Sequence, residues 1–537
     1  MKKILGYDKL RGGYYTPKPI ADFIVQWAIR HTDDTILEPS CGDGSFIQSF
    51  IANGGNPKNI TGVELDPVES EKAKRYGSTI INEDFFIFYS RAIQDKCRYD
   101  VVLGNPPFIR SQNFDEKYRQ KAFSLMEAEG LHPNRLTNIW IPFLVLSTCA
   151  LQPYGRLGMV IPAEVMQVDY AAEVRQYLSE QYDSLTIVTF KKLLFPNAQQ
   201  EVVLLLGEKT SEKKGIRTIE VDDAEALSTL DLSREDFEVK QLDHNTEKWT
   251  QYYLTNSEIS LIRKLRASSH VTPANELFDV NVGIVSGEND FFLLNEDTRV
   301  EYSLSEEHLT PIVGRADQLR GISFSNEDFR QLIACGRKMY LFSPADDEYG
   351  ALSKSEQNYI DYGVKQGYNS GYKCRIRKKW YVVPRTWKAD AFMLRQVNKY
   401  PRIVFNNTDA QNTDTLHKIR FREQVDGRAV TAAFLNSFTL AMCEIIGRSY
   451  GGGVLTFEPG EVRKLMIPIE GSSNLDFELI DRLAKESRIE EILDYTDKIL
   501  LEDHLNLTHE EVLLLRGVWN RLSNRRIERK KVSVKRA

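Results

Sequence analysis

Seven short apolar runs alternate with segments of helical periodicity through the first half of the chain. The runs lie at residues 35–37, 60–63, 79–82, 101–103, 155–162, 185–190 and 202–206. Between them, apolar residues recur at the spacing of one helix face. Strands that alternate with helices pair in parallel, because a helical crossover returns the chain to the same end of the sheet. The pattern predicts a doubly wound α/β domain.

The pattern changes in the second half. Residues 209–248 are polar and charged, which indicates a domain junction. Strand-like runs mixed with helices follow, and residues 475–520 have helical periodicity. We therefore expect three parts. They are an α/β domain at 1–235, an α+β domain at 236–475, and a helical segment with a basic tail at 476–537.

Glycine, acidic and aromatic residues follow the predicted strands at their carboxyl ends. The segment Cys41–Gly44 carries two glycines, which let the backbone approach a ligand closely. Glu64 follows about 20 residues later, the distance at which nucleotide-binding α/β folds place a carboxylate on ribose hydroxyls. Asp84-Phe85 ends the third strand. Taken alone, Asp84 could cap a helix and Glu64 could form a surface ion pair, whereas the ordered set predicts a ligand site at this edge.

The fourth strand ends in Gly104-Asn105-Pro106-Pro107-Phe108. Proline fixes φ and has no backbone N–H, so the two prolines end the strand and leave carbonyl oxygens without ladder partners. These acceptors lie beside the Asn105 amide and the Phe108 ring, a combination that suits an exocyclic amine on a planar base. A strand-terminating turn without function is the alternative for this motif taken alone.

Composition narrows the class of protein. The chain has 537 residues, 42% of them hydrophobic and 27% charged, as is ordinary for a globular protein of two or more domains. A net charge of −6 means that a nucleic acid would be held by local basic patches. Six cysteines without a CxxC pair predict a reducing compartment and no metal site. Without an apolar signal segment or a membrane-length run, we expect a cytoplasmic protein with no membrane partner.

The ordered motifs resemble those of the gamma-type adenine-N6 DNA methyltransferases of bacterial restriction–modification systems, which are class I S-adenosylmethionine-dependent enzymes. The matching segments are Thr16-Pro17, Glu38–Gly44, Glu64, Asp84-Phe85 and Asn105–Phe108. The resemblance extends through the strand at 202–206 and is diffuse beyond it. Phe108 stands where the family more often has tyrosine, which keeps an aromatic face and loses a hydroxyl. The resemblance implies a Rossmann-like methyltransferase sheet followed by a DNA target-recognition domain.

The resemblance also implies S-adenosyl-L-methionine as the cofactor. Thr16 would bind its methionine carboxylate and Glu64 its ribose hydroxyls. Asp84 would accept from its adenine amine, with Phe85 against the adenine ring. The implied cofactor-binding residues are Tyr15, Thr16, Pro17, Glu38, Pro39, Cys41, Gly42, Gly44, Glu64, Leu65, Asp84, Phe85, Asn105 and Phe143.

The implied catalytic residues are Asn105, Pro106, Pro107 and Phe108. The Asn105 side-chain oxygen and the Pro106 carbonyl would accept the two hydrogens of the adenine amine. A base inside a duplex cannot reach such a site, so it must flip out, and aromatic stacking offsets part of that cost. Phe108 and Phe195 are the candidate stacking faces, although a lone phenylalanine before proline is more often a core residue.

Residues 372–388 combine basic and aromatic side chains without an acid, which fits contact with phosphates and bases. The DNA-binding candidates are Lys373, Arg375, Arg377, Lys378, Lys379, Trp380, Arg385 and Trp387. A solvated charged face is the alternative. Further on, Asn406 and Asn407 end a strand and could recognise adenine edges. The basic tail at 521–537 fits either a grip on the DNA backbone or a disordered end.

The sequence therefore predicts a site-specific DNA adenine-N6 methyltransferase that acts on double-stranded DNA. A restriction–modification system further implies a separate restriction endonuclease as a partner. RNA adenine or protein glutamine methylation is one alternative, because similar Asn-Pro-Pro motifs serve there, but the second half of the chain would then have no role. A catalytically inactive DNA-binding defence subunit is another alternative. A fused nuclease is disfavoured, because the chain carries no convincing nuclease motif.

Overall fold

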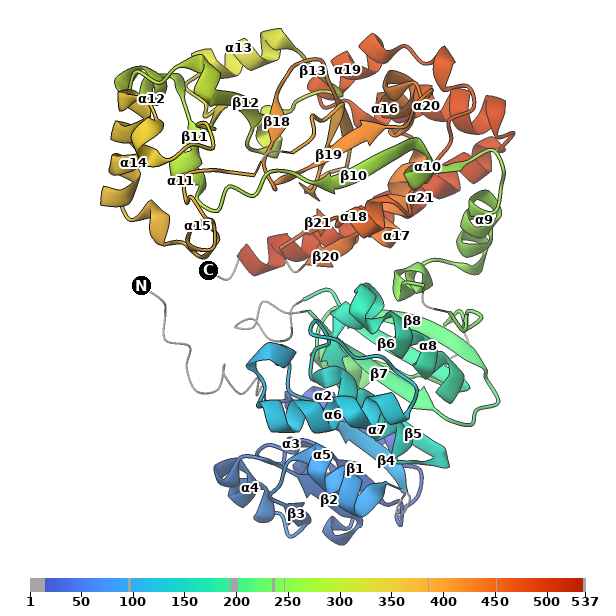
Figure 1. The fold of residues 1–537 in the computed structure, drawn as a ribbon. Coiled ribbons are helices and arrows are strands. Elements are labelled where there is room, and N and C mark those ends of the chain that lie inside the picture. Colours follow the sequence, from blue (N-terminus) through green and yellow to red (C-terminus); the bar gives the residue numbers. More distant parts are fainter. Residues whose placement is uncertain are drawn as a thin grey trace. The chain divides into compact units, whose positions relative to one another are not determined.

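The computed structural model describes residues 15–94, 98–192, 194, 201–233, 237–245, 247–384, 386–450 and 452–534. Contacts divide the chain into two compact units (Figure 1). The first comprises Met1–Ile259 with Tyr450–Gly453 and Ile527–Ala537, and the second comprises Ser260–Ser449 with Val454–Arg526. The three-part division expected from the sequence, with boundaries after residues 235 and 475, stays a prediction.

The first unit contains an eight-stranded sheet with the order β3-β2-β1-β4-β5-β7-β6-β8. The strands are β1 (Ile36–Glu38), β2 (Ile60–Val63), β3 (Thr79–Ile81), β4 (Tyr99–Gly104), β5 (Leu151–Pro162), β6 (Ser184–Phe190), β7 (Val202–Glu208) and β8 (Gly215–Val221). From β3 to β5 all pairs are parallel, and β7 runs antiparallel to β5 and β6. The chain passes outward from β1 to β3 and then returns to β4 beside β1. This reversal is the topological switch point, where such sheets bind ligands.

Apolar helix faces cover this sheet. The helices are α2 (Lys18–Ala28), α3 (Ser45–Ala52), α4 (Pro67–Lys74), α5 (Phe85–Phe88), α6 (Glu116–Ala128), α7 (Trp140–Cys149) and α8 (Ala172–Gln181). Ile20 and Ile24 of α2 share a buried cluster with Phe46 of α3 and Val101 of β4. The contact between α2 and the sheet is close, since a Cβ built on Gly158 of β5 would lie 2.5 Å from the Cγ2 atom of Ile24.

Helix α2 follows Pro17, which is its N-cap and makes no side-chain capping hydrogen bond. Helix α7 ends at Cys149, and β5 begins soon after it at Leu151. Every α7 residue from Trp140 to Thr148 is buried, because a segment without a polar face cannot lie on the surface.

The second unit is of the α+β class, with several small sheets in place of one large one. Its largest sheet has the order β10-β19-β15-β17-β13, and a four-stranded sheet has the order β11-β14-β12-β18. The strands are β9 (Thr272–Pro273), β10 (Phe278–Val282), β11 (Leu293–Leu294), β12 (Leu309–Val313), β13 (Ser323–Phe324), β14 (Tyr340–Phe342), β15 (Ala391–Leu394), β16 (Gln396–Val397), β17 (Ile403–Asn406), β18 (Gln411–Asn412), β19 (Leu416–Phe421), β20 (Arg448–Tyr450), β21 (Val454–Thr456) and β22 (Met466–Ile467). The predicted fold class, a doubly wound sheet followed by an α+β domain, is confirmed.

Short helices connect these strands, and longer ones end the chain. They are α9 (Asn256–Arg266), α10 (Ala274–Leu277), α11 (Asn289–Phe292), α12 (Glu296–Glu301), α13 (Asn326–Ala334), α14 (Lys354–Lys365), α15 (Tyr372–Arg375), α16 (Gly427–Ala433), α17 (Ser437–Ile446), α18 (Pro459–Val462), α19 (Phe477–Lys485), α20 (Ile489–Asp497) and α21 (His509–Val534). Over the described ranges no single helix is long and apolar enough to cross a membrane, and only the bent pair α16–α17 meets that criterion together, by length and composition.

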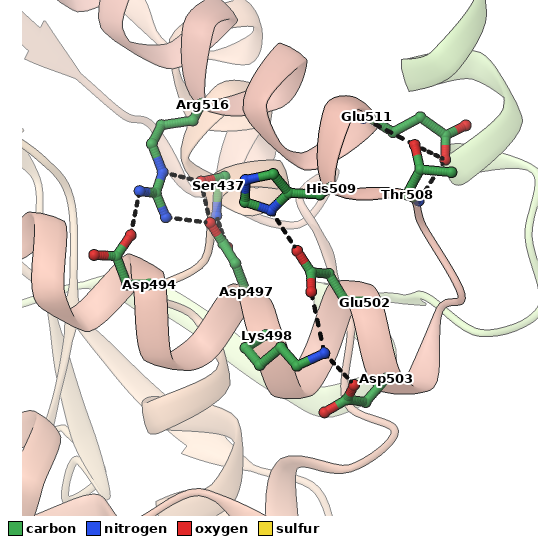
Figure 2. Close-up of polar contacts among 10 residues, drawn as sticks. All are labelled: Ser437, Asp494, Asp497, Lys498, Glu502, Asp503, Thr508, His509, Glu511 and Arg516. Carbon is green, nitrogen blue, oxygen red and sulfur yellow. Dashed lines mark hydrogen bonds and ion pairs between the residues drawn. The ribbon is translucent and has the colours of Figure 1, made fainter.

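Buried polar contacts hold the last helices in place. Figure 2 shows Asp497 of α20 accepting hydrogen bonds from the backbone N–H and the hydroxyl of Ser437 in α17, at 2.7 and 2.6 Å. The Arg516 guanidinium of α21 reaches the same carboxylate at 2.8 Å. Burial raises the pKa of Asp497, and the contacts with Ser437 and Arg516 oppose that rise. Helices α17, α20 and α21 therefore meet at one hydrogen-bonded carboxylate, and this contact fixes their positions along one another.

Candidate active site

A cavity of about 480 Å³ lies at the carboxyl ends of strands β1 to β4. Ten of the sequence-predicted site residues line it. They are Tyr15, Pro39, Gly42, Glu64, Leu65, Asp84, Phe85, Asn105, Pro107 and Phe143. The other predicted residues of this region do not belong to the wall. They are Thr16, Pro17, Glu38, Cys41, Gly44, Pro106 and Phe108. The predicted strand ends therefore meet at one cavity, as the parallel order requires.

Glu64 joins two loops of the cavity wall. Its Oε2 atom accepts from the backbone N–H of Gly42 at 2.9 Å, and its Oε1 atom accepts from the N–H of Asp66 at 2.8 Å. Gly42 has a φ of +52°, a conformation that glycine adopts without the strain of a Cβ. The glycine loop after β1 and the turn after β2 are thus tied together by one carboxylate, whose position is fixed before any ligand binds.

Asp84 both caps a helix and lines the cavity. Its Oδ1 atom accepts from the backbone N–H groups of Phe86 and Ile87 at 3.0 and 3.1 Å, so the capping role expected as an alternative is present. The carboxyl group is buried, and this burial raises its pKa to about 6 against the lowering effect of the two N–H groups. Beside it, the rings of Phe85 and Phe143 stack with centroids 5.1 Å apart and form an apolar wall.

Glu38 and Cys41 lie behind the wall. Glu38 is 1% exposed, its Oε2 atom has no hydrogen-bond partner among the described residues, and burial raises its pKa well above the ordinary value. Burial also raises the pKa of the Cys41 thiol, with Glu38 and Glu64 adding to the effect. A Cβ built on Gly62 would lie 2.9 Å from the Cys41 sulfur. Cys41 therefore packs the loop against β2.

Asn105 is held from two sides. Its Nδ2 atom donates to the hydroxyl oxygen of Thr16 at 3.2 Å, and the Ser40 hydroxyl donates to its backbone carbonyl at 3.3 Å. Since Thr16 accepts from the amide nitrogen, its own hydroxyl hydrogen can be given to another acceptor. Pro106 is buried, and Phe108 is half-buried and packs partly against the apolar core of the sheet.

Two parts of the wall contain none of the candidate residues named from the sequence. The first is the segment after Phe108, which contributes Ile109, Asn113, Phe114, Asp115 and Tyr118. Its Phe114 ring contacts Phe86 edge-on, with centroids 6.2 Å apart. The second part is a set of acids next to predicted residues, namely Asp66, Glu69 and Glu83. Their adjacency to Glu64 and Asp84 was the only signal in the sequence.

The cavity is strongly acidic. Six carboxylates line it, from Glu64, Asp66, Glu69, Glu83, Asp84 and Asp115. Among its described lining residues there is no lysine, arginine or histidine. Carboxylates accept hydrogen bonds and favour cations, so this wall suits a ligand with hydroxyls, amines and positive charge. A ligand rich in phosphates would meet only repulsion here.

The DNA-binding candidates of the second unit have mixed surroundings. Lys373, Arg375 and Lys378 are exposed. Lys379 pairs with Asp346 at 3.0 Å, and the Trp380 ring packs 4.8 Å from that of Phe291 in a buried aromatic cluster. These two side chains thus have partners within the protein.

Four further candidates differ from one another. Arg377 donates to the carbonyl of Val285 at 2.8 Å and lies over the Phe292 ring. Arg385 and the stacking candidate Phe195 lie outside the described residues. The expectation that Asn406 recognises adenine is wrong. Its buried amide donates to the carbonyls of Ala389 and Ala410, and so it shapes a turn.

Comparison with known proteins identifies both halves of the chain. The family model N-6 DNA Methylase matches residues 6–276, and the model of the C-terminal domain of Type II methyltransferase M.Eco57I matches residues 246–501. Type II methyltransferase M.AccI of Acinetobacter calcoaceticus is 25% identical and aligns over 94% of this chain and 96% of its own. Type II methyltransferase M.XamI of Xanthomonas campestris pv. amaranthicola is 22% identical over 86% of each chain.

A solved structure extends the likeness to the fold of nearly the whole chain. The Type IIL restriction-modification enzyme MmeI, solved in complex with DNA, superposes with a TM-score of 0.57 over 94% of this chain and 75% of its own, at 10% identity. The resemblance inferred from the order of the motifs is confirmed. The chain belongs to the N-6 DNA methylase family and is a DNA N6-methyltransferase of the kind found in restriction–modification systems.

Proposed function

We propose that this chain transfers the methyl group of S-adenosyl-L-methionine to the exocyclic amine of an adenine flipped out of double-stranded DNA. The observation that carries the proposal is the position of Asn105 at the end of β4, in the wall of an acidic cavity. A separate restriction endonuclease would recognise the same site in unmodified DNA.

The cavity fits this cofactor in volume and in chemistry. S-adenosylmethionine carries a sulfonium cation, an ammonium group, two ribose hydroxyls and an adenine amine, and no phosphate. The described lining residues include six carboxylates and no basic side chain. Such a wall matches that set of donors and positive charges. When bound, the cofactor supplies an electrophilic methyl group. Thr16, Glu64 and Asp84 would hold its carboxylate, ribose and adenine amine, and Phe85 with Phe143 would flank its adenine ring.

The remaining task of the protein is to position the target amine and stabilise the charge that develops on it. Adenine's amine is a poor nucleophile, because its lone pair is delocalised into the ring. The Asn105 side-chain oxygen and the Pro106 carbonyl would accept its two hydrogens and hold the nitrogen in line. Phe108 would stack on the flipped base. Stacking contributes ~1–3 kcal/mol per base, which offsets much of the cost of extrusion.

Methylation-sensitive long-read sequencing of a host that expresses the gene tests the proposal. Wild-type protein should produce N6-methyladenine within one short recurring sequence, and Asn105→Ala should produce none. Absence of any new mark from the wild type would overturn the proposal in favour of another substrate or an inactive subunit. An equal mark from both proteins would retain the function and refute the assignment of Asn105.

Cofactor affinity should depend on pH through Asp84. The pKa of this carboxyl is raised to about 6, and its ionised form is the better acceptor for an amine. Affinity should therefore be complete above pH 7 and fall as pH drops through 6, by about tenfold at pH 5. Titration calorimetry at pH 5, 6 and 7.5 measures the change.

Two variants separate Asp84 from its neighbours. Asp84→Asn keeps an oxygen for the cap of α5 and removes the titrating group, so its affinity should be lower and nearly independent of pH. Glu83→Gln removes a second carboxylate of the wall and should keep the fall near pH 6. A wild-type affinity that is constant between pH 5 and 7.5 would refute the role of Asp84.

Thr16 should link cofactor binding to catalysis through its single hydroxyl, which accepts from Asn105 and can donate to a carboxylate. Thr16→Val keeps the shape and removes the hydroxyl. We expect about tenfold weaker cofactor binding. We also expect a several-fold lower kcat, because the side-chain amide of Asn105 would be free to rotate. Thr16→Ser should restore both within a few-fold. If Thr16→Val lowers only thermal stability, the hydroxyl has no such role.

A further inference from the structure

Lys418 of β19 carries its charge at the end of a largely buried side chain, and no acidic partner lies beside it among the described residues. The residue is 5% exposed, and its ammonium makes no hydrogen bond or ion pair within the part of the chain that the structure describes. Lysine is rarely buried unless it is paired, because removing an ammonium from water is costly. The ammonium lies over an aromatic ring, with the Nζ atom 4.4 Å from the centroid of Trp387.

Arg420 brings a second cation to the same ring. It lies two residues further along β19, so its side chain leaves the same face of the sheet as that of Lys418. The Cζ atom of its guanidinium lies 4.5 Å from the centroid of Trp387. The two charges repel each other, and burial together with Arg420 lowers the pKa of Lys418. Two ordered cations thus converge on one half-buried indole.

The acid opposite Arg420 in the sheet is already paired with another cation. Asp279 of β10 is the cross-strand partner of Arg420 in the register of the sheet. Its carboxylate instead pairs with the Arg422 guanidinium at 3.0 Å. The cross-strand partner of Lys418 is Asn281, whose exposed side-chain amide adds a hydrogen-bond donor to this face and no charge. The face is therefore built from donors and positive charge around an aromatic platform.

We propose that Lys418, Arg420 and Trp387 form a phosphate-binding site that holds the backbone of the DNA substrate. A phosphate would neutralise both cations, and cation–π contacts with the indole order the two side chains before it binds. Partial burial strengthens the attraction, because water screens it less. The inference rests on the proposed function for its substrate, and it assigns to the second unit a contact that orients the duplex without reading its sequence.

The test compares Lys418→Met/Arg420→Gln with wild type in the full-length protein. Binding to a fluorescent duplex is measured by anisotropy over a series of NaCl concentrations. Loss of two phosphate-contacting cations should weaken binding about tenfold or more at low salt and reduce the slope of log K against log[NaCl] by about 1 to 2. Methionine at 418 keeps the packing against Trp387, and thermal unfolding checks that the variant folds.

Further variants control for changes in net charge and for loss of folding. Asp279→Asn/Arg422→Gln removes an ion pair of the same sheet and leaves the net charge unchanged, so its slope should equal that of wild type. Lys418→Arg should restore most of the affinity. Arg420 is exposed, so Arg420→Gln alone should fold and still reduce the slope by about 1. An unchanged slope in Arg420→Gln would overturn the proposal even if the double variant failed to fold.

Three outcomes separate this site from the proposed function. If wild type binds and methylates duplex DNA and the double variant binds it with the same affinity and slope, the site is refuted while the function stands. If inorganic phosphate stabilises wild type but not the double variant and the DNA slopes are equal, the residues bind a free anion, which also refutes a contact with DNA. If wild type binds S-adenosylmethionine but no duplex, the proposed function itself fails.

Discussion

Replacement of Asn105 by alanine is expected to lower the kcat of methyl transfer by about 10²–10³-fold. The side-chain oxygen is proposed to accept from the target amine as positive charge develops on its nitrogen. The chain must therefore hold that acceptor in place before reaction, and the Asn105 amide already makes a hydrogen bond to the Thr16 hydroxyl at 3.2 Å. Single-turnover kinetics with labelled cofactor and a saturating duplex measure the effect directly.

The affinity for cofactor should change much less, by no more than about threefold, because the lost contact is made to the base. Asn113→Ala is a matched control, since this amide lines the same cavity away from β4. It should alter the Kd of the cofactor more than kcat. Parallel losses of kcat and of cofactor affinity in Asn105→Ala would show that the residue only supports the cofactor site.

Replacement of Arg526 by alanine is expected to lower the free energy of unfolding of the second unit by about 3–5 kcal/mol. Arg526 of α21 and Glu444 of α17 form an ion pair at 2.7 Å, with side chains only 2% and 3% exposed. The guanidinium also donates to the backbone carbonyl of Asn398 at 2.8 Å. Truncation leaves a buried carboxylate without its partner, and that desolvated charge dominates the loss.

The double variant Glu444→Leu/Arg526→Met separates this explanation from a general packing loss. It removes both charges and fills a similar volume, so it should recover most of the stability that Arg526→Ala loses. Urea unfolding followed by tryptophan fluorescence and circular dichroism measures the three proteins. If the double variant is as unstable as Arg526→Ala, the buried charge is not the cause.

Local patterns were sufficient to predict the sheet and the edge at which its ligand site lies. Strand runs and helix periodicity are properties of neighbouring residues, and parallel order brings the carboxyl ends of the strands together. Gly42, Glu64, Asp84 and Asn105 accordingly reach one cavity. The wall provided by Phe114 could not be located, because its contact with Phe86 depends on how the segment after Phe108 folds back.

The basic stretch of the second unit shows the limit of composition as a guide. Its charges are all cationic over residues 372–388, yet Lys379 pairs with Asp346 and Trp380 packs on Phe291. Those partners lie 33 and 89 residues away in sequence. Lys418, in turn, occurs in an unremarkable strand. A lysine that lacks an acidic partner among the described residues can be recognised only from the positions of its neighbours in the structure.

Among the residues that the structure describes, those that line the cavity all lie between Tyr15 and Phe143. The proposed chemistry and the target recognition that the resemblance implies for the second half would thus occupy different stretches of the gene. Recombination within the second half could exchange one recognised sequence for another while the cofactor site is inherited intact. Such exchanges would have to keep the short segments Tyr450–Gly453 and Ile527–Ala537 compatible with the first unit, to which they belong. A lineage of these enzymes can therefore diversify its targets without evolving its catalysis anew.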